Sequence, residues 1–300
     1  MFNYEAHFSG RIEHRVINPR EGDTFFSNLN PDNVQSRNFT LLSGGLSFFR
    51  EWENFSNYYQ FLATSRAPSI EDLFSDGPHL GNYAYEIGDP KLEQENTLGF
   101  ENTISLFNSN YTLNLTSYVN YSPNYHISQK MGDGYIPGAD WIEWGSGPTG
   151  WLYKYKLMGL EALIYGFEPS FNFNFKSSKI NCNVSILRGI NIDNNDPLSY
   201  MPPDHIRIQY EKNALFLTNT FEAILVSAQN RLGEFETETG GYSLLNYFGS
   251  YTISKEEKTY KIIVQIKNIL NQTYYNHLSK IKMIMPEPGT SLNISYRMYF

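Results

Sequence analysis

The sequence predicts an all-β protein whose antiparallel strands form a transmembrane β-barrel. Apolar side chains recur at every second residue in many segments, which is the pattern of a strand with two different faces. The connections between these segments alternate between short and long. Aromatic residues make up 16% of the 300 residues and charged residues 18%. A barrel in lipid carries aromatic girdles at both interfaces, so this composition favours one.

Alternation is clearest at the C-terminus, where Leu292, Ile294, Tyr296, Met298 and Phe300 are separated by mostly polar residues. The same pattern predicts about twelve strands. We expect them near residues 3–17, 38–50, 55–65, 93–106, 110–125, 152–168, 180–190, 204–212, 216–230, 242–254, 259–269 and 291–300.

Segment 168–179 is ambiguous, because Phe171, Phe173 and Phe175 alternate and one interpretation joins them to the sixth strand. The remaining connections are sorted by length. The short ones are 51–54, 107–109, 176–179, 212–214 and 255–257, and the long ones are 18–37, 67–92, 126–150, 191–203, 231–241 and 270–290. Outer-membrane barrels have short periplasmic turns and long extracellular loops. The sorting therefore places the long loops outside the cell.

A membrane barrel also has a physical reason to close. In hydrocarbon, each unpaired backbone N–H or C=O group costs several kcal/mol, so every strand needs a neighbour on both sides. The predicted strands of about 9–14 residues match a tilted membrane span. The mean hydropathy of -0.44 agrees with a barrel, because every second residue faces a polar interior.

Several classes of protein are disfavoured. The formal net charge of -8 argues against nucleic acid as a partner. Cys182 is the single cysteine, so the chain forms no internal disulfide and no cysteine-based zinc cluster. No serine-hydrolase, phosphate-loop, dinucleotide or zinc-protease motif is present, so we predict neither an enzyme nor a bound cofactor. The first ten residues show no signal peptide.

Several segments resemble motifs of the TonB-dependent receptor family, in the family's order and over nearly the whole chain. The matching residues are Arg66, Pro68, Glu71, Leu73 and Phe74 in segment 65–74, Gly88 and Pro90 in segment 85–95, Gly159 and Glu161 at the start of a strand, and Asn268, Asn271 and Tyr274 in segment 268–279, followed by Gly289. Asp89 replaces the usual Asn, and Leu270 the usual Phe. Any one motif is weak, but their order and spacing are specific.

This resemblance implies a 22-stranded outer-membrane barrel with an N-terminal plug and a segment that engages TonB. Residues 1–300 correspond to the C-terminal part of that barrel, and the sequence shows no plug, so we expect a fragment or a truncated form. The implied function is active import of a scarce nutrient, with a metal or a metal chelate (siderophore, haem or zinc) as the favoured cargo. The implied partners are outer-membrane lipid, the TonB complex acting through the plug, and a small ligand.

The terminal strand suggests one more partner. Tyr296, Met298 and Phe300 resemble the C-terminal signal that the outer-membrane assembly machinery reads, by adding the strand to an open sheet edge. The alternative is an ordinary last strand.

Ligand-binding residues are expected in the long loops. The candidates are His79, Tyr83, Tyr85, Glu86, Asp133, Asp140, Trp141 and Trp144. Imidazole and carboxylate groups suit zinc and other divalent metals, and His79 is the candidate metal ligand. The alternative is that these groups are solvated loop residues. Trp141, Trp144 and Trp151 fit a stacking role or an aromatic girdle equally well. Tyr274, Tyr275 and His277 fit a girdle or loop packing better than ligand binding.

Two other functions compete with transport. A complete twelve-stranded outer-membrane enzyme, such as a lipase, needs a Ser–His pair at the outer rim. His79, His126 and His277 are available, but no motif marks the serine. A soluble all-β binding module would have no reason to sort its loops by length.

Overall fold

The computed structural model describes residues 3–19, 34–143, 150–255 and 257–300. Twelve long strands, here called the wall strands, are hydrogen-bonded side by side in chain order. They are β1 (Asn3–Ile17), β2 (Arg37–Trp52), β3 (Phe55–Arg66), β6 (Glu95–Phe107), β7 (Tyr111–Lys130), β9 (Trp151–Phe175), β10 (Ser178–Asn191), β12 (His205–Ala214), β13 (Leu217–Val226), β14 (Tyr242–Lys255), β15 (Lys258–Lys267) and β16 (Ser291–Tyr299).

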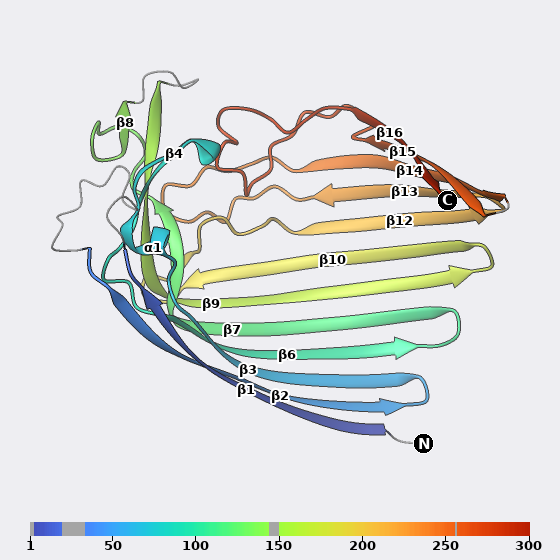
Figure 1. The fold of residues 1–300 in the computed structure, drawn as a ribbon, viewed down its shortest axis with the longest axis horizontal. Helices are drawn as coiled ribbons and strands as arrows, with labels where there is room; N and C mark the ends of the chain where they lie inside the picture. The colour runs from blue at the N-terminus through green and yellow to red at the C-terminus, as the bar shows by residue number, and fades with distance from the viewer. Residues whose placement is uncertain (1–2, 20–33, 144–149, 256) are drawn as a thin grey trace.

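The predicted all-β antiparallel fold is confirmed, and each of the twelve expected strands has a counterpart among the wall strands. The sheet curves into a trough whose strands run between two unlike ends (Figure 1). Short turns lie at one end, together with both chain termini, and the long connections gather at the other. Residues 168–175 of the ambiguous segment belong to the sixth wall strand, β9, and residues 178–179 begin β10.

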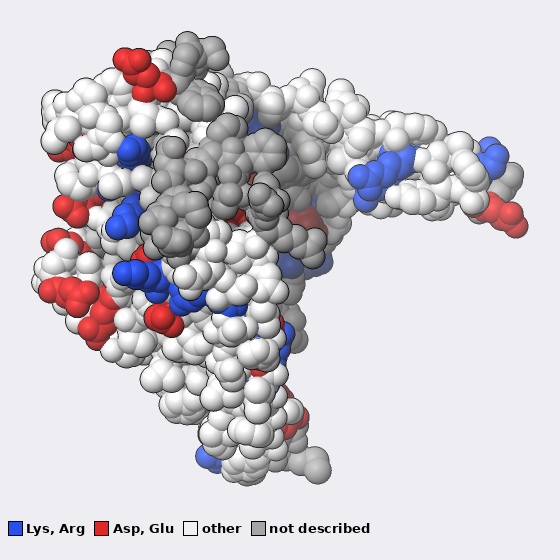
Figure 2. All heavy atoms as spheres, turned by 60° about the vertical axis from the view of Figure 1, so that its left-hand side comes forward, with Lys and Arg blue, Asp and Glu red and all other residues white. Residues whose placement is uncertain are grey.

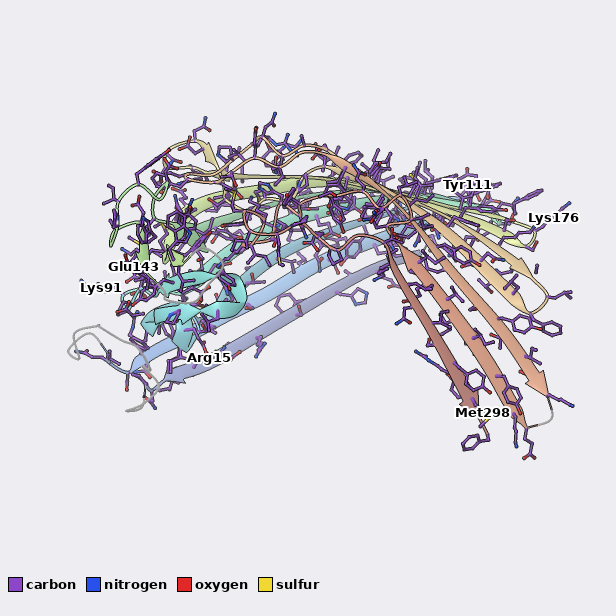
Figure 3. All side chains as sticks on the ribbon, turned by 90° about the horizontal axis from the view of Figure 1, so that it is seen from above. Arg15, Lys91, Tyr111, Glu143, Lys176 and Met298 are labelled. Carbon is purple, nitrogen blue, oxygen red and sulfur yellow. The ribbon has the colours of Figure 1, made fainter. Side chains whose placement is uncertain are left out.

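Neighbouring strands place their apolar residues on one common face. Phe8 lies opposite Leu46, Leu46 opposite Phe61, and Phe61 opposite Phe100. At the other edge, Ile294 is 64% exposed. An uncovered apolar face of this extent needs an apolar solvent. The side chains project from the curved sheet in Figure 3, where Tyr111 and Lys176 mark the short-turn end and Lys91 and Glu143 the loop end.

The opposite face of the sheet is polar. Glu222 on β13 is 3% exposed and accepts hydrogen bonds from three neighbours on the same face. The donors are Arg207 Nε at 2.5 Å, Gln209 Nε2 at 2.8 Å and Asn246 Nδ2 at 2.8 Å. A carboxylate that is buried away from water is costly unless hydrogen-bond donors surround it, and these three donors meet that requirement. This face therefore corresponds to the inner face of a barrel.

The wall strands form an open sheet. In the described residues, β1 pairs with β2 and β16 pairs with β15, and these two edge strands do not pair with each other. A complete twelve-stranded barrel, which the enzyme alternative required, would need that pairing. The two edges lie at opposite ends of the sheet in Figure 1.

The long connections hold the remaining elements, which are α1 (Ile70–Phe74), β4 (Asp76–His79), η2 (Leu80–Asn82), β5 (Ala84–Ile87), β8 (Trp141–Glu143) and β11 (Asp196–Pro197). Both β5 and β8 pair with the loop-end part of β9. A small apolar core forms under α1, where Leu73 and Phe74 pack against Phe39 and Leu41 of β2. Among the described residues, no helix is long and apolar enough to cross a membrane.

Candidate ligand-binding site in the long loops

The loop 67–92 owes its shape to residues of the first family motif. Ser69 caps α1 reciprocally: its Oγ accepts from Asp72 N–H at 3.1 Å, and its own N–H donates to Asp72 Oδ2 at 2.9 Å. Leu73 and Phe74 are 0% and 4% exposed, and Pro68 is also fully buried. Arg66 donates to Glu95 at 2.7 Å at the base of the loop.

The second motif completes the same loop. Gly88 packs on α1, and its N–H donates to Ser75 O at 2.7 Å. A Cβ at this position would lie 2.7 Å from the backbone carbon of Leu73, so only glycine fits. The carbonyl of Pro90 accepts a hydrogen bond from Arg37. These motif residues, and Glu71 on α1, build the loop and do not line the pocket described below.

Asn268 and Asn271 start the last long loop with left-handed backbone, at φ values of 50° and 49°. Asparagine tolerates this conformation better than other residues with a side chain. Asn268 is 3% exposed, and its Nδ2 donates to Gln272 O at 2.9 Å and Pro288 O at 3.3 Å. Gly289 lies against the side chain of Asn271, whose Oδ1 would be 2.6 Å from a Cβ at this position.

The remaining motif residues also have structural contacts. The ring of Tyr274 packs on that of Tyr242 with centroids 4.4 Å apart. Glu161 on β9 accepts a hydrogen bond from Tyr121 OH at 2.6 Å. Gly159 lies against Asn124, where a Cβ would collide with the amide. The family motifs therefore mark the residues that fix the loops to the wall strands.

A pocket of about 180 Å³ lies among these loops. It is lined by Tyr83, Lys130, Trp151, Tyr153, Tyr155, Tyr200, Phe235, Glu236, Thr237, Lys280, Lys282, Met283 and Ile284. Acidic and basic side chains lie over this loop end in Figure 2, and others lie along the strands that extend away from it.

Each of the three lysines in the pocket lining lies against a tyrosine ring. Lys130 Nζ lies 4.1 Å from the ring centroid of Tyr153, and Lys280 Nζ lies 4.8 Å from that of Tyr155. A third ammonium, on Lys282, lies 5.7 Å from the Tyr200 ring. Each cation faces an electron-rich ring, which holds it in place without cancelling its charge.

Glu86 connects the predicted ligand residues to the pocket. Its carboxylate lies 3.3 Å from Lys280 Nζ and 3.1 Å from His79 Nδ1, and it accepts from Asn82 at 3.3 Å. Burial on its own would raise the pKa of Glu86, but Lys280, Asn82 and His79 together lower it below its usual value. Tyr83 lines the pocket itself, Glu86 contacts the lining residue Lys280, and His79 lies behind Glu86.

A buried polar cluster forms the floor next to Lys282. His277 is 1% exposed, and its Nε2 lies 2.9 Å from Glu236 Oε1. Its Nδ1 faces the Lys282 ammonium at 3.3 Å and Thr239 Oγ1 at 3.0 Å, so Nδ1 accepts and Nε2 carries the proton. Three separate loops meet at this cluster, because Glu236 Oε1 also accepts from Tyr200 N–H at 3.0 Å.

Burial and pairing set the charges in this cluster. Burial opposes the ionised form of Glu236, but hydrogen bonds from His277 and from the N–H groups of Gly233 and Tyr200 lower its pKa overall. Burial lowers the pKa of Lys282, and Glu236 partly offsets this. The Tyr200 hydroxyl donates to Tyr155 OH at 2.9 Å, and burial together with this neighbour raises the pKa of Tyr200.

Other predicted ligand residues lie outside the pocket. Tyr85 is 9% exposed, and its hydroxyl donates to Asp76 Oδ1 at 2.8 Å. Asp140 is 7% exposed and accepts from two backbone N–H groups of its own loop, at 3.2 and 3.1 Å. The ring of Trp141 packs on Trp151, 5.2 Å away between centroids, and supports the pocket wall from behind.

Two candidates remain. Asp133 interacts electrostatically with Lys130 and does not itself line the pocket. Trp144 lies outside the described residues. Within the described ranges, no group of three or more His, Cys, Asp or Glu side chains could hold a metal ion. A metal at His79 stays a prediction, with Glu86 as its one neighbouring acid in the described part of the chain.

Sequence reasoning missed most of the pocket. Tyr83 and Trp151, a candidate for stacking, line it, while the three lysines and the other aromatic lining residues were not singled out. Two sequence patterns could have indicated these residues. Two lysines alternate with apolar residues in segment 280–284, and every second residue of segment 151–155 is aromatic. Nothing in either segment shows that the two meet.

Comparison with solved structures shows the same fold in a copper transporter and in two siderophore-related receptors. The copper transporter OprC superposes with a TM-score of 0.75 at 17% identity, over 96% of this chain and 45% of that protein. A variant of the ferric enterobactin receptor PfeA of Pseudomonas aeruginosa gives 0.60 at 16%, over 89% and 40%. The siderophore receptor PirA of Acinetobacter baumannii gives 0.61 at 16%, over 87% and 41%.

At these identities the likeness concerns the fold alone, and the chain spans less than half the length of each of these proteins. The family model described as "TonB dependent receptor-like, beta-barrel" matches residues 3–269, which is most of the chain. The chain thus belongs to the TonB-dependent receptor family and carries its β-barrel domain.

Proposed function

We propose that this chain is the C-terminal part of an outer-membrane receptor that imports an anionic metal chelate by TonB-dependent transport. The observation that carries the proposal is the charge of the pocket. Three lysines line it, Glu236 is the one carboxylate among its described lining residues, and Glu86 pairs with Lys280 from outside the lining. Glu236 is already engaged by His277 and by Lys282, at 2.9 and 3.7 Å.

The pocket also favours a ligand with flat rings. Tyr83, Tyr153, Tyr155, Tyr200, Phe235 and Trp151 supply aromatic surface. Aromatic faces and edges pack well against a planar ligand, and ammonium groups between them attract its negative charge. A bare divalent cation would be repelled by the three ammonium groups. It would also find no group of three ligands among the described His, Cys, Asp and Glu residues.

The family supports transport as the activity, and the names of two similar structures, a ferric enterobactin receptor and a siderophore receptor, agree with a chelate as the cargo. Copper ion is the second candidate. Met283 lines the pocket, and a thioether sulfur suits Cu(I). The first structural match is a copper transporter.

The remaining parts of the proposal follow from the family. The wall strands cross the outer membrane, and further strands pair with the free edges of β1 and β16 to close the barrel. TonB acts through a plug inside the polar face, where Glu222 lies. The barrel assembly machinery recognises the terminal strand through Tyr296, Met298 and Phe300.

The test is a binding titration on the full-length protein purified from outer membranes. The probes are a ferric tris-catecholate, ferric citrate, haem, Zn²⁺ and Cu⁺. We expect the ferric tris-catecholate to bind with the highest affinity, and Lys280→Met to weaken that binding about tenfold. Lys255→Met, at the short-turn end, is the control and leaves binding unchanged.

Two results would contradict the proposal. If Zn²⁺ or Cu⁺ alone binds and every chelate fails, the pocket is a metal-ion site. If the native protein is recovered in the soluble fraction, without the heat-dependent gel mobility of a folded barrel, the membrane assignment is wrong.

A further inference from the structure

Eight residues other than glycine have a left-handed backbone in the described part of the chain. They are Tyr83, Lys176, Asn195, Tyr200, Leu215, Phe235, Asn268 and Asn271. A positive φ brings the Cβ of most residues too close to a carbonyl oxygen, so each such position is conformationally unfavourable unless the residue is glycine or asparagine.

Five of the eight are asparagines or lie in two-residue hairpin turns. Asn195, Asn268 and Asn271 carry the side chain that best tolerates this conformation. Lys176 and Leu215 occupy the tight hairpin turns that join β9 to β10 and β12 to β13. Two-residue hairpin turns demand a positive φ, whatever residue is present.

The other three are aromatic, and all three line the same pocket. Tyr83, Tyr200 and Phe235 have φ values of 50°, 59° and 58°, and they come from three different loops. None of these loops is a two-residue hairpin, so hairpin geometry does not explain their backbone. Three bulky residues with this unfavourable backbone surround one cavity of about 180 Å³, which points to a common cause.

Local contacts hold each of the three backbones in place. Phe235 lies in a turn closed by a 3.2 Å hydrogen bond from Glu236 N–H to Gly233 O, at a position where such a turn prefers glycine. Tyr200 is held at both its backbone and its ring. Its N–H donates to Glu236 Oε1 at 3.0 Å, and its hydroxyl donates to Tyr155 OH at 2.9 Å. Tyr83 caps the C-terminal end of η2, where its N–H donates a hydrogen bond to Leu80 O at 3.3 Å.

We propose that Tyr83, Tyr200 and Phe235 determine which ligand the pocket accepts, because left-handed backbone at each position fixes its ring in the pocket wall. This inference rests on the proposed function and deepens it. Strain that persists at a ligand site is a form of pre-organisation: the folded loops bear an unfavourable backbone so that binding does not have to order the rings. A ring selects for planar ligands, so selectivity is the property that these residues set.

The experiment separates the ring from the backbone at Phe235. Phe235→Gly removes the ring and relieves the backbone, Phe235→Leu removes the ring and keeps the unfavourable backbone, and Phe235→Trp keeps an aromatic ring. Leu215→Gly is the matched control, because it relieves the same conformation in a turn that lies at the other end of the strands and is 100% exposed. All four are made in the full-length protein, and heat-dependent gel mobility confirms that each is folded.

The first readout is the ratio of affinities for a ferric tris-catecholate and for ferric citrate, which are both anionic but differ in aromatic rings. We expect the ratio to fall about tenfold in Phe235→Gly and Phe235→Leu, and to stay unchanged in Phe235→Trp and Leu215→Gly. The second readout is amide hydrogen exchange in segment 227–241. Exchange should be slower in Phe235→Gly than in Phe235→Leu, because glycine removes the strain.

The outcomes are distinguishable. If the unmodified protein binds neither chelate, the proposed function fails and this inference with it. If it binds the aromatic chelate but the ratio is the same in Phe235→Gly and Phe235→Leu as in the unmodified protein, the proposed function stands and the inference is overturned. Equal or faster exchange in Phe235→Gly than in Phe235→Leu would also overturn it, since the backbone would then bear no strain.

Discussion

Lys280 Nζ lies 3.3 Å from Glu86 Oε1, although the two residues are 194 positions apart in the sequence. The pair joins loop 67–92 to the last long loop, beside the pocket that Lys280 lines. The two side chains are 21% and 28% exposed, so solvent screens the pair in part. The bridge therefore aligns the two loops more than it stabilises them.

A double-mutant cycle measures this contribution. For Glu86→Gln, Lys280→Met and the double variant, we expect a coupling free energy of about 0.5–1 kcal/mol for local opening of loop 67–92. Amide hydrogen exchange in that loop gives the opening free energies. Purely additive effects of the two substitutions would show that the pair in the structure contributes nothing.

Gly88→Ala should destabilise the same loop through overpacking. A Cβ at this position would lie 2.8 Å from both Asp72 O and Phe74 N, so α1 has to shift. We expect a cost of about 1–3 kcal/mol, seen as faster protease cleavage in loop 67–92. Gly240→Ala is the control, because a Cβ there meets nothing within 4 Å. The packing argument is wrong if the two variants are cleaved equally fast.

Acid should loosen the cluster around Glu236. The pKa of Glu236 is lowered from its ordinary 4.5 in the folded protein. A carboxyl group of this kind stabilises the fold above its ordinary pKa, and that stabilisation is lost as the pH falls through the lowered value. We expect exchange protection in segments 227–241 and 270–290 to be constant from about pH 7 to pH 5. Protection should then decrease as the pH falls below the ordinary pKa of a glutamate. Glu236→Gln should abolish this step, and a step that survives in the variant would assign it to another group.

Removal of the terminal ring should impair assembly without affecting binding. Phe300 is 88% exposed and follows β16, whose apolar residues lie on the same parity. Phe300→Ser is expected to lower the amount of folded protein in outer membranes several-fold, with an unchanged Kd per folded molecule. Tyr299→Ser, on the opposite parity, is the matched control. An equal loss in both variants would indicate a general packing effect instead of a recognition signal.

The sequence predicted the wall strands well because their two faces meet different solvents. Period-two alternation follows directly from that difference, and it holds even where the end of a strand was ambiguous, as at Phe171–Phe175 in β9. The sorting of connections by length is also confirmed, because the short turns lie at one end of the strands and the long connections at the other.

The site was far less predictable, because loop residues carry no such periodicity. Lys280 meets Glu86 only through the conformations of two long loops, and His277 reaches Glu236 in the same way. Asp140 was misleading for a local reason. Its carboxylate accepts from the N–H groups of Gly134 and Ile136, which is how aspartate commonly shapes a turn.

The pairing of β5 with β9 makes the two sides of the pocket mechanically unequal. Ala84 to Ile87 run parallel to Tyr153 to Lys156 as an extra strand, so loop 67–92 is continuous with the sheet. In the described part of the chain, the bonds that tie segment 276–287 to the other loops all involve a side chain, such as that of Lys282. Backbone pairing therefore holds the β5 side of the pocket, whereas side-chain substitutions such as Lys282→Met can loosen the side formed by segment 276–287.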